Sequence, residues 1–377
     1  MRILHLITRM DGGGSAVNTL ISATMQQQVG HHVVLAFGPS DGSEMSDIER
    51  EQLAGRMQVF REVGGETVVL ASLTRQPGWA DIPAYRQMRQ LIERGFDVVH
   101  THTSKAGALG RLAAWGRARA VVHTPHGHVF HGYFGKLKTR LFVGIERFLA
   151  GRAHALIALT KAERDDHLAL KVGKPGQWRV IPSGVNVGGI QTEIMTWREA
   201  HPDARPWDAV SVGRLVPIKA MDRLLRAWMR VCEEKPEARL AIVGDGEERE
   251  SLEAMCGMMN LEGNICFSGW SNPIPFLAAS RCFVLLSHNE GMGRAVVEAM
   301  AAGLPCVVSD VCGLKELVTS DCGAVVDAAD VGAIAAALMR DWPDDMPAAC
   351  EKRAEAYSVD VMADALQGLY EALLKNA

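Results

Sequence analysis

Residues 282–309, CFVLLSHNEGMGRAVVEAMAAGLPCVVS, contain two apolar runs on either side of a segment with helical spacing. The runs 282–286 and 306–309 are predicted strands, and residues 294–302 are a predicted helix. A strand, a helix and a second strand in this order form a crossover unit whose two strands lie parallel in one sheet. This segment therefore predicts an α/β fold.

The same alternation extends through the rest of the chain and restarts near its middle. In the first half we predict strands at 2–7, 32–37, 97–100, 120–124 and 155–159. In the second half we predict further strands at 209–212, 240–243 and 264–267, and helices near 219–234, 247–259, 294–302 and 330–341. Two doubly wound, Rossmann-like units are therefore expected, each a parallel sheet wrapped by helices.

The domain boundaries are predicted where this pattern breaks. We place a first domain at 1–185 and a second at 208–355. An interdomain linker is expected at 186–207, which lacks a clean period and contains two adjacent glycines. Residues 356–377 have the pattern of a helix with an apolar face, and we expect this helix to cross back to the first domain.

The composition is that of a folded globular protein. A chain of 377 residues has room for about two domains, and 48% hydrophobic with 22% charged residues argues against disorder. No apolar run approaches the roughly 18 residues of a membrane-spanning helix. The opening MRILHLITRM is too short for the apolar region of a signal peptide. We therefore expect a cytoplasmic protein.

The net charge of −4 conceals an asymmetry between the two halves. Residues 1–185 have 23 Lys and Arg against 15 Asp and Glu, whereas residues 186–377 have 17 against 29. The two halves are therefore expected to face different partners. Nucleic-acid binding has little support, because the net charge is negative and no recognition module is present.

A glycine-rich loop, TRMDGGGS at 8–15, follows the first predicted strand. Glycines such as Gly13 and Gly14 let backbone N–H groups approach an anion at a helix N-terminus. The glycines are contiguous, unlike the spaced glycines of a dinucleotide-binding fingerprint. A tight turn with no ligand explains the loop equally well.

Histidines cluster near the ends of two predicted strands: His100, His102, His123, His126, His128 and His131. The segment 120–133 contains no Asp, Glu or Cys to complete a mixed metal site, so we predict no metal here. His126 follows the carboxyl end of a predicted strand, where open α/β sheets bind their ligands. It is the best single candidate for a hydrogen-bonding or acid–base role.

Two cations follow the predicted strand 209–212, in the sequence GRLVPIK at 213–219. Arg214 and Lys219 at this position suit a diphosphate whose negative charge grows as it leaves. Two solvated surface charges are the alternative interpretation.

In the segment quoted first, glycines separate two carboxylates. Gly291 and Gly293 expose N–H groups beside the start of a helix, which suits a phosphate. Glu290 precedes them and Glu298 lies about one turn into the helix, so one carboxylate can bind sugar hydroxyls and the other a ribose diol. The segment therefore suits a nucleotide sugar, although this spacing of carboxylates also occurs by chance.

These motifs occur together in one chain, and their order is informative. They are Gly13-Gly14, HTHTSKAG at 100–107, His126-Gly127, Arg214 with Lys219, and Glu290 followed after seven residues by Glu298. The combination resembles the family 4 glycosyltransferases of the GT-B fold, in particular the bacterial branch that builds cell-surface polysaccharides. The resemblance runs from residue 8 to about residue 316 and includes the terminal helix.

The resemblance implies two Rossmann-like domains that face across a cleft, the first on the acceptor side and the second binding the donor. It implies a retaining hexosyltransferase that takes a hexose from a UDP- or GDP-linked sugar to a glycan or polyprenyl-linked acceptor, in lipopolysaccharide or exopolysaccharide synthesis. No metal and no cofactor are implied, since the nucleotide sugar is a substrate. The alternatives are an epimerase or phosphorylase of the same fold, or a non-catalytic scaffold that binds a nucleotide sugar.

The resemblance also assigns roles to residues. His126 would lie beside the reacting sugar and Glu290 would bind sugar hydroxyls. Arg214 and Lys219 would neutralise the departing diphosphate. The donor-binding residues would be Gly13, Gly14, Gly213, Gly244, Trp270, Gly291, Met292, Gly293, Arg294 and Glu298. The chain departs from the family pattern at Ala220, Met292 and Arg294, and the last two are expected to tune the choice of sugar.

A basic, amphipathic stretch at 131–152 contains five Lys and Arg residues against one Glu. Lys136, Lys138 and Arg140 begin this stretch among apolar side chains. Such a helix can lie on an anionic membrane and bring the enzyme to a lipid-linked acceptor. The alternative is an ordinary helix that packs on the first sheet, and the two interpretations are compatible if they concern different faces.

Overall fold

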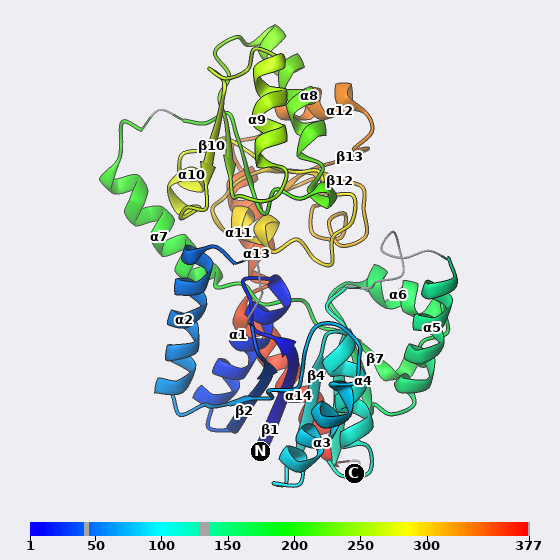
Figure 1. Ribbon diagram of the computed structural model, residues 1–377. Coiled ribbons are helices and arrows are strands. Elements are labelled where there is room, and N and C mark those ends of the chain that lie inside the picture. The colour runs from blue at the N-terminus through cyan, green and yellow to red at the C-terminus, as the bar shows by residue number, and fades with distance from the viewer. Residues whose placement is uncertain (41–44, 128–135, 205, 376–377) are drawn as a thin grey trace. The chain divides into compact units, whose positions relative to one another are not determined.

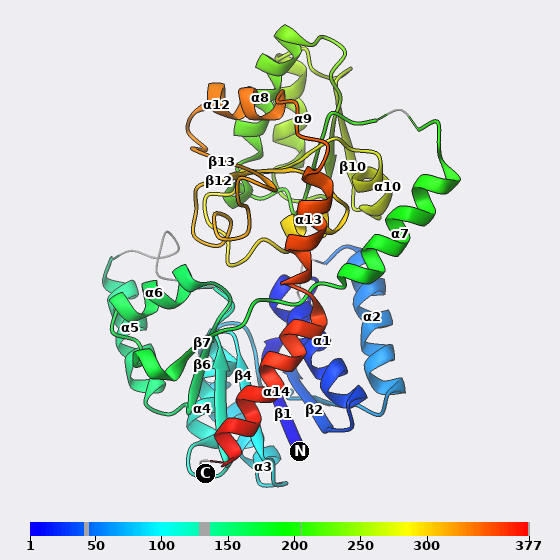
Figure 2. The ribbon, with the colours of Figure 1, turned by 180° about the vertical axis from the view of Figure 1, so that it is seen from behind.

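The protein is described by a computed structural model that covers residues 1–40, 45–127, 136–204 and 206–375, and the chain forms two compact units. Unit 1 consists of Met1–Gly184 and Val359–Ala377, and unit 2 consists of Val185–Ser358. Figures 1 and 2 show that each unit is built from a central sheet with helices packed around it.

Unit 1 contains a parallel sheet in the order β3-β2-β1-β4-β5-β6-β7. Its strands are β1 (Arg2–Arg9), β2 (His32–Gly38), β3 (Glu66–Val69), β4 (Val98–His102), β5 (Ala120–Thr124), β6 (Ala155–Ala158) and β7 (Trp178–Val180). Its helices are α1 (Gly14–Gln28), α2 (Asp47–Glu62), α3 (Asp81–Ile92), α4 (Ser104–Ala114), α5 (Lys136–Ala150), α6 (Lys161–Ala169) and α14 (Val359–Lys375), with a short 3-10 turn η1 (Pro175–Gln177).

Unit 2 contains a second parallel sheet in the order β10-β9-β8-β11-β12-β13. Its strands are β8 (Ala209–Val212), β9 (Leu240–Val243), β10 (Ile265–Gly269), β11 (Phe283–Leu285), β12 (Cys306–Ser309) and β13 (Gly323–Val326). Its helices are α7 (Val187–Ala200), α8 (Met221–Glu234), α9 (Arg249–Met258), α10 (Ile274–Ala278), α11 (Arg294–Ala301), α12 (Val331–Leu338) and α13 (Met346–Glu355), with a 3-10 turn η2 (Pro217–Lys219).

These sheets confirm the predicted class of two doubly wound α/β units. The predicted strands occur at their expected places, within about two residues at either end. Three strands were not predicted, namely β3, β7 and β13, and each lies at an edge of its sheet. Edge strands are short and half-exposed, so they lack the continuous apolar run of a central parallel strand.

The predicted linker at 186–207 is instead largely helical. Its first part forms α7, which belongs to unit 2. The Asn186 side chain accepts a hydrogen bond from Gly189 N–H at 3.2 Å and caps the helix. Arg198 then donates to the carbonyls of Ala278 and Ala302 at 3.0 and 3.1 Å, which fixes α7 to its neighbours α10 and α11. The two adjacent glycines fall in the first turn of α7, where they do not prevent the helix.

Alternate side chains of each central strand in unit 1 enter two separate cores. On β1, Ile3 and Ile7 are buried together with α1, α2 and α14, whereas Leu4 and Leu6 are buried together with α3 and α4. This period of two places helices on both faces of the sheet. A strand buried on both faces must be apolar throughout, which is why these strands are evident in the sequence.

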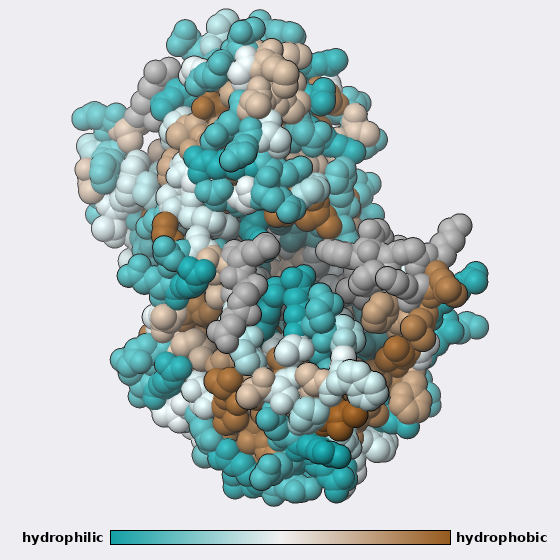
Figure 3. Space-filling view, in the orientation of Figure 1, coloured by the Kyte–Doolittle hydropathy of each residue, from teal (hydrophilic) through white to brown (hydrophobic). Residues whose placement is uncertain are grey.

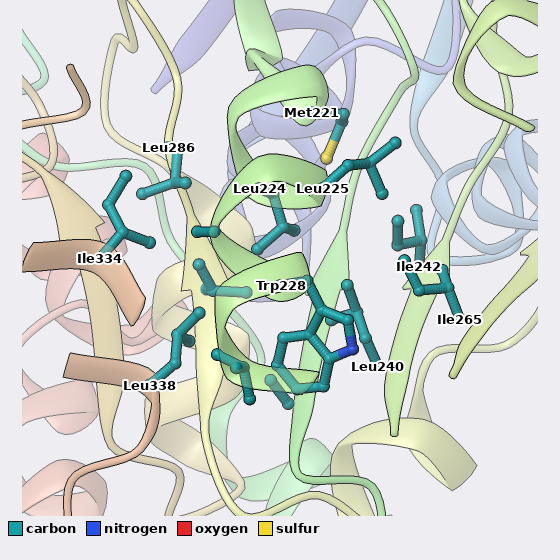
Figure 4. Close-up of a cluster of buried hydrophobic side chains, with 14 of the residues drawn as sticks. Met221, Leu224, Leu225, Trp228, Leu240, Ile242, Ile265, Leu286, Ile334 and Leu338 are labelled. Carbon is teal, nitrogen blue, oxygen red and sulfur yellow. The ribbon is translucent and has the colours of Figure 1, made fainter. Parts of the chain in front are cut away.

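The core of unit 2 is organised around α8. Met221, Leu224, Leu225 and Trp228 follow the helical spacing i, i+3, i+4, i+7 and are all buried. Figure 4 shows these side chains among Leu240, Ile242 and Ile265 from β9 and β10, with Leu286, Ile334 and Leu338 on the other side of α8. The helix that follows η2 is therefore held firmly against the sheet.

The last helix, α14, confirms the predicted return to the first domain. Its apolar residues Met362, Leu366, Leu369 and Tyr370 are buried in the same core as the side chains of β1 and α1. The helix contacts α1 and β5, and Figure 2 shows it lying along unit 1. The side chain of Gln367 adds a polar contact, because its Oε1 lies 2.6 Å from Nε2 of His31.

We predict that Leu366→Ala destabilises unit 1 by about 2–5 kcal/mol, because it removes a buried side chain and leaves a cavity. Val361→Ala on the same helix is the matched control, since Val361 is 47% exposed and Leu366 is 3% exposed. The control is expected to change stability by less than about 0.5 kcal/mol. Urea unfolding followed by circular dichroism measures both. Equal unfolding curves for the two variants would show that α14 does not stabilise unit 1.

Candidate functional site

Lys219 and Glu290 come from loops after two different strands and form an ion pair in unit 2. Lys219 Nζ lies 2.6 Å from Glu290 Oε2, and the same oxygen accepts a hydrogen bond from Ser287 Oγ at 3.1 Å. The N–H of His288 donates to the carbonyl of Ile218 at 2.8 Å. These bonds tie the loop after β11 to the turn η2, so the pair is fixed at the carboxyl edge of the sheet.

Two further predicted charged residues of unit 2 are Arg214 and Glu298. Arg214 is exposed and Glu298 is half-buried in α11. Within the residues that the structure describes, neither side chain has a hydrogen-bond or ion-pair partner. Both side chains are therefore available to a ligand, the Arg214 guanidinium as a donor and the Glu298 carboxylate as an acceptor.

The glycines after β8 and β9 permit a close approach of two loops. A Cβ atom at Gly244 would lie 1.9 Å from the carbonyl oxygen of Gly213, and one at Gly246 would lie 2.3 Å from that of Leu215. The N–H of Gly244 also donates to the carbonyl of Gly269 at 2.9 Å, and Trp270 follows as a half-buried side chain. Side chains larger than hydrogen at Gly244 or Gly246 would separate these loops.

The loop at 290–293 is packed against a second loop at 311–314, which sequence analysis did not identify. Gly293 has φ 75°, a conformation that favours glycine, and α11 begins directly after it without a side-chain cap. A Cβ atom at Gly313 would lie 2.3 Å from the carbonyl oxygen of Glu290. Met292, a predicted donor-binding residue, is buried between these loops and is only 3% exposed.

In unit 1 the glycine-rich loop contains a local turn, the alternative that the sequence left open beside an anion site. The N–H of Gly13 donates to Asp11 Oδ1 at 3.0 Å, and Asp11 Oδ2 lies 2.6 Å from Arg9 Nε. An anion at Gly13 would have to compete with the Asp11 carboxylate. The α-helix α1 begins at Gly14 without a side-chain cap, so Gly14 keeps its predicted place at an open helix N-terminus.

His126 lies in the loop after β5 and is held from two sides. Its φ of 59° is unusual for a residue with a side chain. The next N–H, that of Gly127, donates to Glu163 Oε1 at 2.8 Å, and the other carboxylate oxygen of Glu163 accepts from Leu159 N–H at 2.6 Å. On the imidazole itself, Nε2 lies 2.9 Å from Nδ1 of His102.

Burial determines the charge state of these groups. It lowers the pKa of His126 to about 3 and that of His5 to about 4, and it lowers the pKa of His102 well below its usual value. Burial also raises the pKa of Glu163 to about 7, against the opposing effect of the N–H groups of Leu159 and Gly127. The imidazoles are therefore neutral at pH 7, and His126 acts there as a neutral hydrogen-bonding group.

The imidazoles of His5, His100 and His102 lie close enough for a metal ion, since one nitrogen of each falls within 4.8 Å of the others. Every nitrogen of these rings already has a hydrogen-bond partner. His5 bonds Gln26 and His102, His102 bonds His5 and His126, and His100 bonds Tyr370 and Thr124. A metal ion would have to break several of these buried bonds, so this cluster is better suited to hydrogen bonding than to coordination.

Sequence analysis missed His5, Gln26 and Glu163. The signal for His5 is a histidine inside the apolar run RILHLI, because a polar residue in a buried strand needs a partner. Of the predicted histidines, His128 and His131 lie outside the described residues.

The basic stretch at 131–152 forms α5 from Lys136 onward. Residues 131–135 and the side chains of Lys136 and Lys138 lie outside the described part of the structure. One face of α5 is buried through Val143, Leu149 and Ala150, and Glu146 on this helix binds Arg111 Nη2 at 2.8 Å. The opposite face exposes Leu137, Leu141, Ile145 and Phe148. One face of α5 therefore packs against unit 1, and the opposite face presents apolar side chains to solvent.

Among the described residues, none of the helices combines the length and apolarity that crossing a membrane requires.

Two family models match the chain, one in each half. The model described as "Glycosyl transferase 4-like domain" matches residues 12–184, and the model described as "Glycosyl transferases group 1" matches residues 194–356. Their boundary falls near the junction between units 1 and 2.

The chain is also similar to characterised relatives. It is 33% identical over 264 residues to the UDP-Gal:alpha-D-GlcNAc-diphosphoundecaprenol alpha-1,3-galactosyltransferase of Escherichia coli, an alignment that covers 66% of this chain and 67% of that protein. It is 28% identical over 314 residues to the D-inositol 3-phosphate glycosyltransferase of Streptomyces avermitilis, covering 74% of this chain and 66% of that protein.

Among solved structures, the crystal structure of Anabaena Alr3699/HepE in complex with UDP and glucose superimposes with a TM-score of 0.78. The match covers 99% of this chain and 100% of that chain at 20% sequence identity. Sucrose-phosphate synthase from Thermosynechococcus elongatus gives the same TM-score at 21% identity and covers 100% of both chains. At these identities the likeness shows the fold, which is GT-B.

Proposed function

The chain belongs to the family 4 glycosyltransferases, and from this premise we propose that it moves a hexose from a nucleoside diphosphate sugar to a polyprenyl-linked or other glycan acceptor in cell-envelope polysaccharide synthesis. UDP is the first nucleotide to test, because it is bound in the Anabaena structure and named in the Escherichia coli relative. The acceptor class is proposed from the diphosphoundecaprenol in that relative's name.

The observation that carries the proposal is the Lys219–Glu290 pair beside the unpaired Arg214. A departing diphosphate gains negative charge in the transition state, and preorganised cations stabilise that charge. Lys219 is held in place by Glu290, whereas Arg214 is free to close on the diphosphate. The N-terminus of α11, which begins after Gly293 without an acidic residue in its first turn, adds further positive potential.

The two carboxylates are proposed to bind the rest of the donor. Glu290 uses one oxygen for Lys219 and Ser287, and its other oxygen is proposed to accept from a sugar hydroxyl. Glu298 is proposed to accept from the ribose diol. With the leaving group neutralised by side chains, we propose that transfer needs no metal and no cofactor, and that it retains the anomeric configuration as the family resemblance implies.

A same-fold epimerase or phosphorylase would use the same donor site with a different co-substrate. An epimerase releases free nucleotide without an acceptor, and a phosphorylase depends on inorganic phosphate. A non-catalytic scaffold would bind nucleotide without turnover. Membership of a transferase family favours transfer over these alternatives.

We predict that Glu298→Ala weakens binding of the preferred nucleoside diphosphate about 10- to 150-fold, the loss expected for one hydrogen bond to a charged group. Isothermal titration of UDP, GDP, ADP and TDP, with and without EDTA, measures this. The matched control is Glu233→Ala, an exposed carboxylate on α8 that is expected to leave the affinity unchanged. Equal affinities for Glu298→Ala and the wild-type protein would remove Glu298 from the site.

We also propose that the exposed face of α5 contacts an anionic membrane surface. Leu137 and Phe148 are 82% and 55% exposed, and Figure 3 shows apolar side chains gathered over this helix. Arg140 is exposed on the same helix, and Arg152 lies over the Phe148 ring at 3.4 Å. Apolar side chains flanked by arginines suit the boundary between acyl chains and anionic headgroups.

The double variant Leu137→Ser, Leu141→Ser is expected to reduce binding to phosphatidylglycerol-containing vesicles by about tenfold or more, given about 1.5–3 kcal/mol for each buried leucine. Vesicle co-sedimentation measures the loss, and pure phosphatidylcholine vesicles measure the contribution of lipid charge. Met258→Ser, at a 79% exposed position in unit 2, is the control. If the double variant and the control bind alike, the face of α5 is not a membrane surface.

A further inference from the structure

A continuous chain of side-chain hydrogen bonds connects the interior of unit 1 to His126. Gln26 Oε1 lies 2.7 Å from His5 Nε2, His5 Nδ1 lies 2.9 Å from His102 Nε2, and His102 Nδ1 lies 2.9 Å from His126 Nε2. Gln26, His5 and His102 are almost fully buried. These residues come from α1, β1 and β4, so three separate elements converge on one imidazole.

The amide oxygen of Gln26, the first acceptor in this series of hydrogen bonds, fixes the position of each proton on the three imidazoles. The amide oxygen of Gln26 can only accept, so His5 must donate from Nε2. A neutral imidazole has one N–H, and His5 Nδ1 therefore accepts from Nε2–H of His102. By the same reasoning, Nδ1 of His102 accepts from Nε2–H of His126. The Nδ1 atom of His126 is then left without a proton.

The Gln26 amide also belongs to a second branch of hydrogen bonds. Its Nε2 lies 3.5 Å from the hydroxyl of Tyr370, and that hydroxyl lies 2.6 Å from Nδ1 of His100. The amide nitrogen donates to the hydroxyl, the hydroxyl donates to His100, and His100 donates from Nε2 to Thr124 Oγ1 at 2.8 Å. Every hydrogen-bonding nitrogen in both branches then has one defined role.

We propose that Gln26, His5 and His102 are positioning residues that hold the proton of His126 on Nε2 and thereby present Nδ1 as a hydrogen-bond acceptor for a sugar hydroxyl of the substrate. Within the described residues, Nδ1 of His126 has no partner. The hydroxyl as ligand rests on the proposed function, whereas the proton position is a property of the free protein.

The proton position is tested without any substrate. In protein labelled with 15N-histidine, long-range proton–nitrogen correlation spectra distinguish protonated from unprotonated ring nitrogens, and His126→Gln identifies the His126 signals. We expect Nδ1 unprotonated and Nε2 protonated in the wild-type protein near pH 7. A proton on Nδ1, protons on both nitrogens, or a stoichiometric metal ion bound to these imidazoles would overturn the proposal.

The positioning role is tested with Gln26→Leu, which removes the first acceptor. We expect the His126 spectrum to change toward a mixture of tautomers, and kcat/KM for transfer to fall about 3- to 10-fold, the range of one neutral hydrogen bond. The matched control is Gln27→Leu, the neighbouring residue of α1, whose side chain accepts instead from Val33 N–H at 2.9 Å. It is expected to leave both the His126 spectrum and kcat/KM unchanged.

Three outcomes separate this proposal from the proposed function. An unchanged His126 spectrum in Gln26→Leu would show that the chain does not set the tautomer. A changed spectrum with unchanged kcat/KM would show that substrate does not use Nδ1. If the spectra behave as expected but no donor supports transfer, the proposed function fails and the proton position holds. The wild-type spectrum alone decides the tautomer if Gln26→Leu does not fold.

Discussion

The parallel alignment of the strands is the constraint on which both candidate sites depend. In each unit the carboxyl ends of all strands meet at one edge, so the loops that follow them are brought together although they are distant in sequence. Lys219 and Glu290 are 71 residues apart and form an ion pair because β8 and β11 are neighbours in the sheet. His102 and His126 meet because His102 is the last residue of β4 and His126 follows β5, and these two strands are also neighbours.

The two units use this edge in different physical ways. Unit 2 combines close backbone approach at Gly244, Gly246 and Gly313 with opposite charges, an arrangement suited to a charged diphosphate and its sugar. Unit 1 has buried, neutral imidazoles and a carboxyl group, Glu163, that accepts hydrogen bonds from two backbone N–H groups. Neutral hydrogen-bonding groups discriminate among hydroxyl positions, whereas cations stabilise developing charge.

The central strands, and the places of Lys219 and Glu290 after two of them, could be predicted from the sequence. The ion pair between these two residues, three of the four edge strands and the histidine chain could not. A strand buried on both faces needs an unbroken apolar run. The strands β3, β7 and β13 each lie at an edge of their sheet and lack such a run. The contact between His5 and His102 joins residues 97 apart and depends on the register in which β1 pairs with β4, which no local pattern encodes.

The bond from Gly13 to Asp11 is local, since an aspartate two residues before a glycine commonly accepts from its N–H. The linker prediction failed because a helix that packs on α10 and α11 needs little amphipathic regularity when its cap and Arg198 supply polar anchors.

The central claim is that the Arg214 and Lys219 edge of unit 2 stabilises a diphosphate leaving group during transfer to a lipid-linked acceptor. The most direct measurement is the transfer of radiolabelled hexose from UDP- and GDP-sugars to N-acetylglucosaminyl-diphosphoundecaprenol, in the presence of EDTA, by the wild-type protein, Arg214→Ala and the exposed control Arg226→Ala. We predict label in the lipid phase with a preferred donor, a fall of about 10²- to 10³-fold for Arg214→Ala, and unchanged transfer for Arg226→Ala. Transfer by Arg214→Ala at the wild-type rate, or no label from any donor, would contradict it.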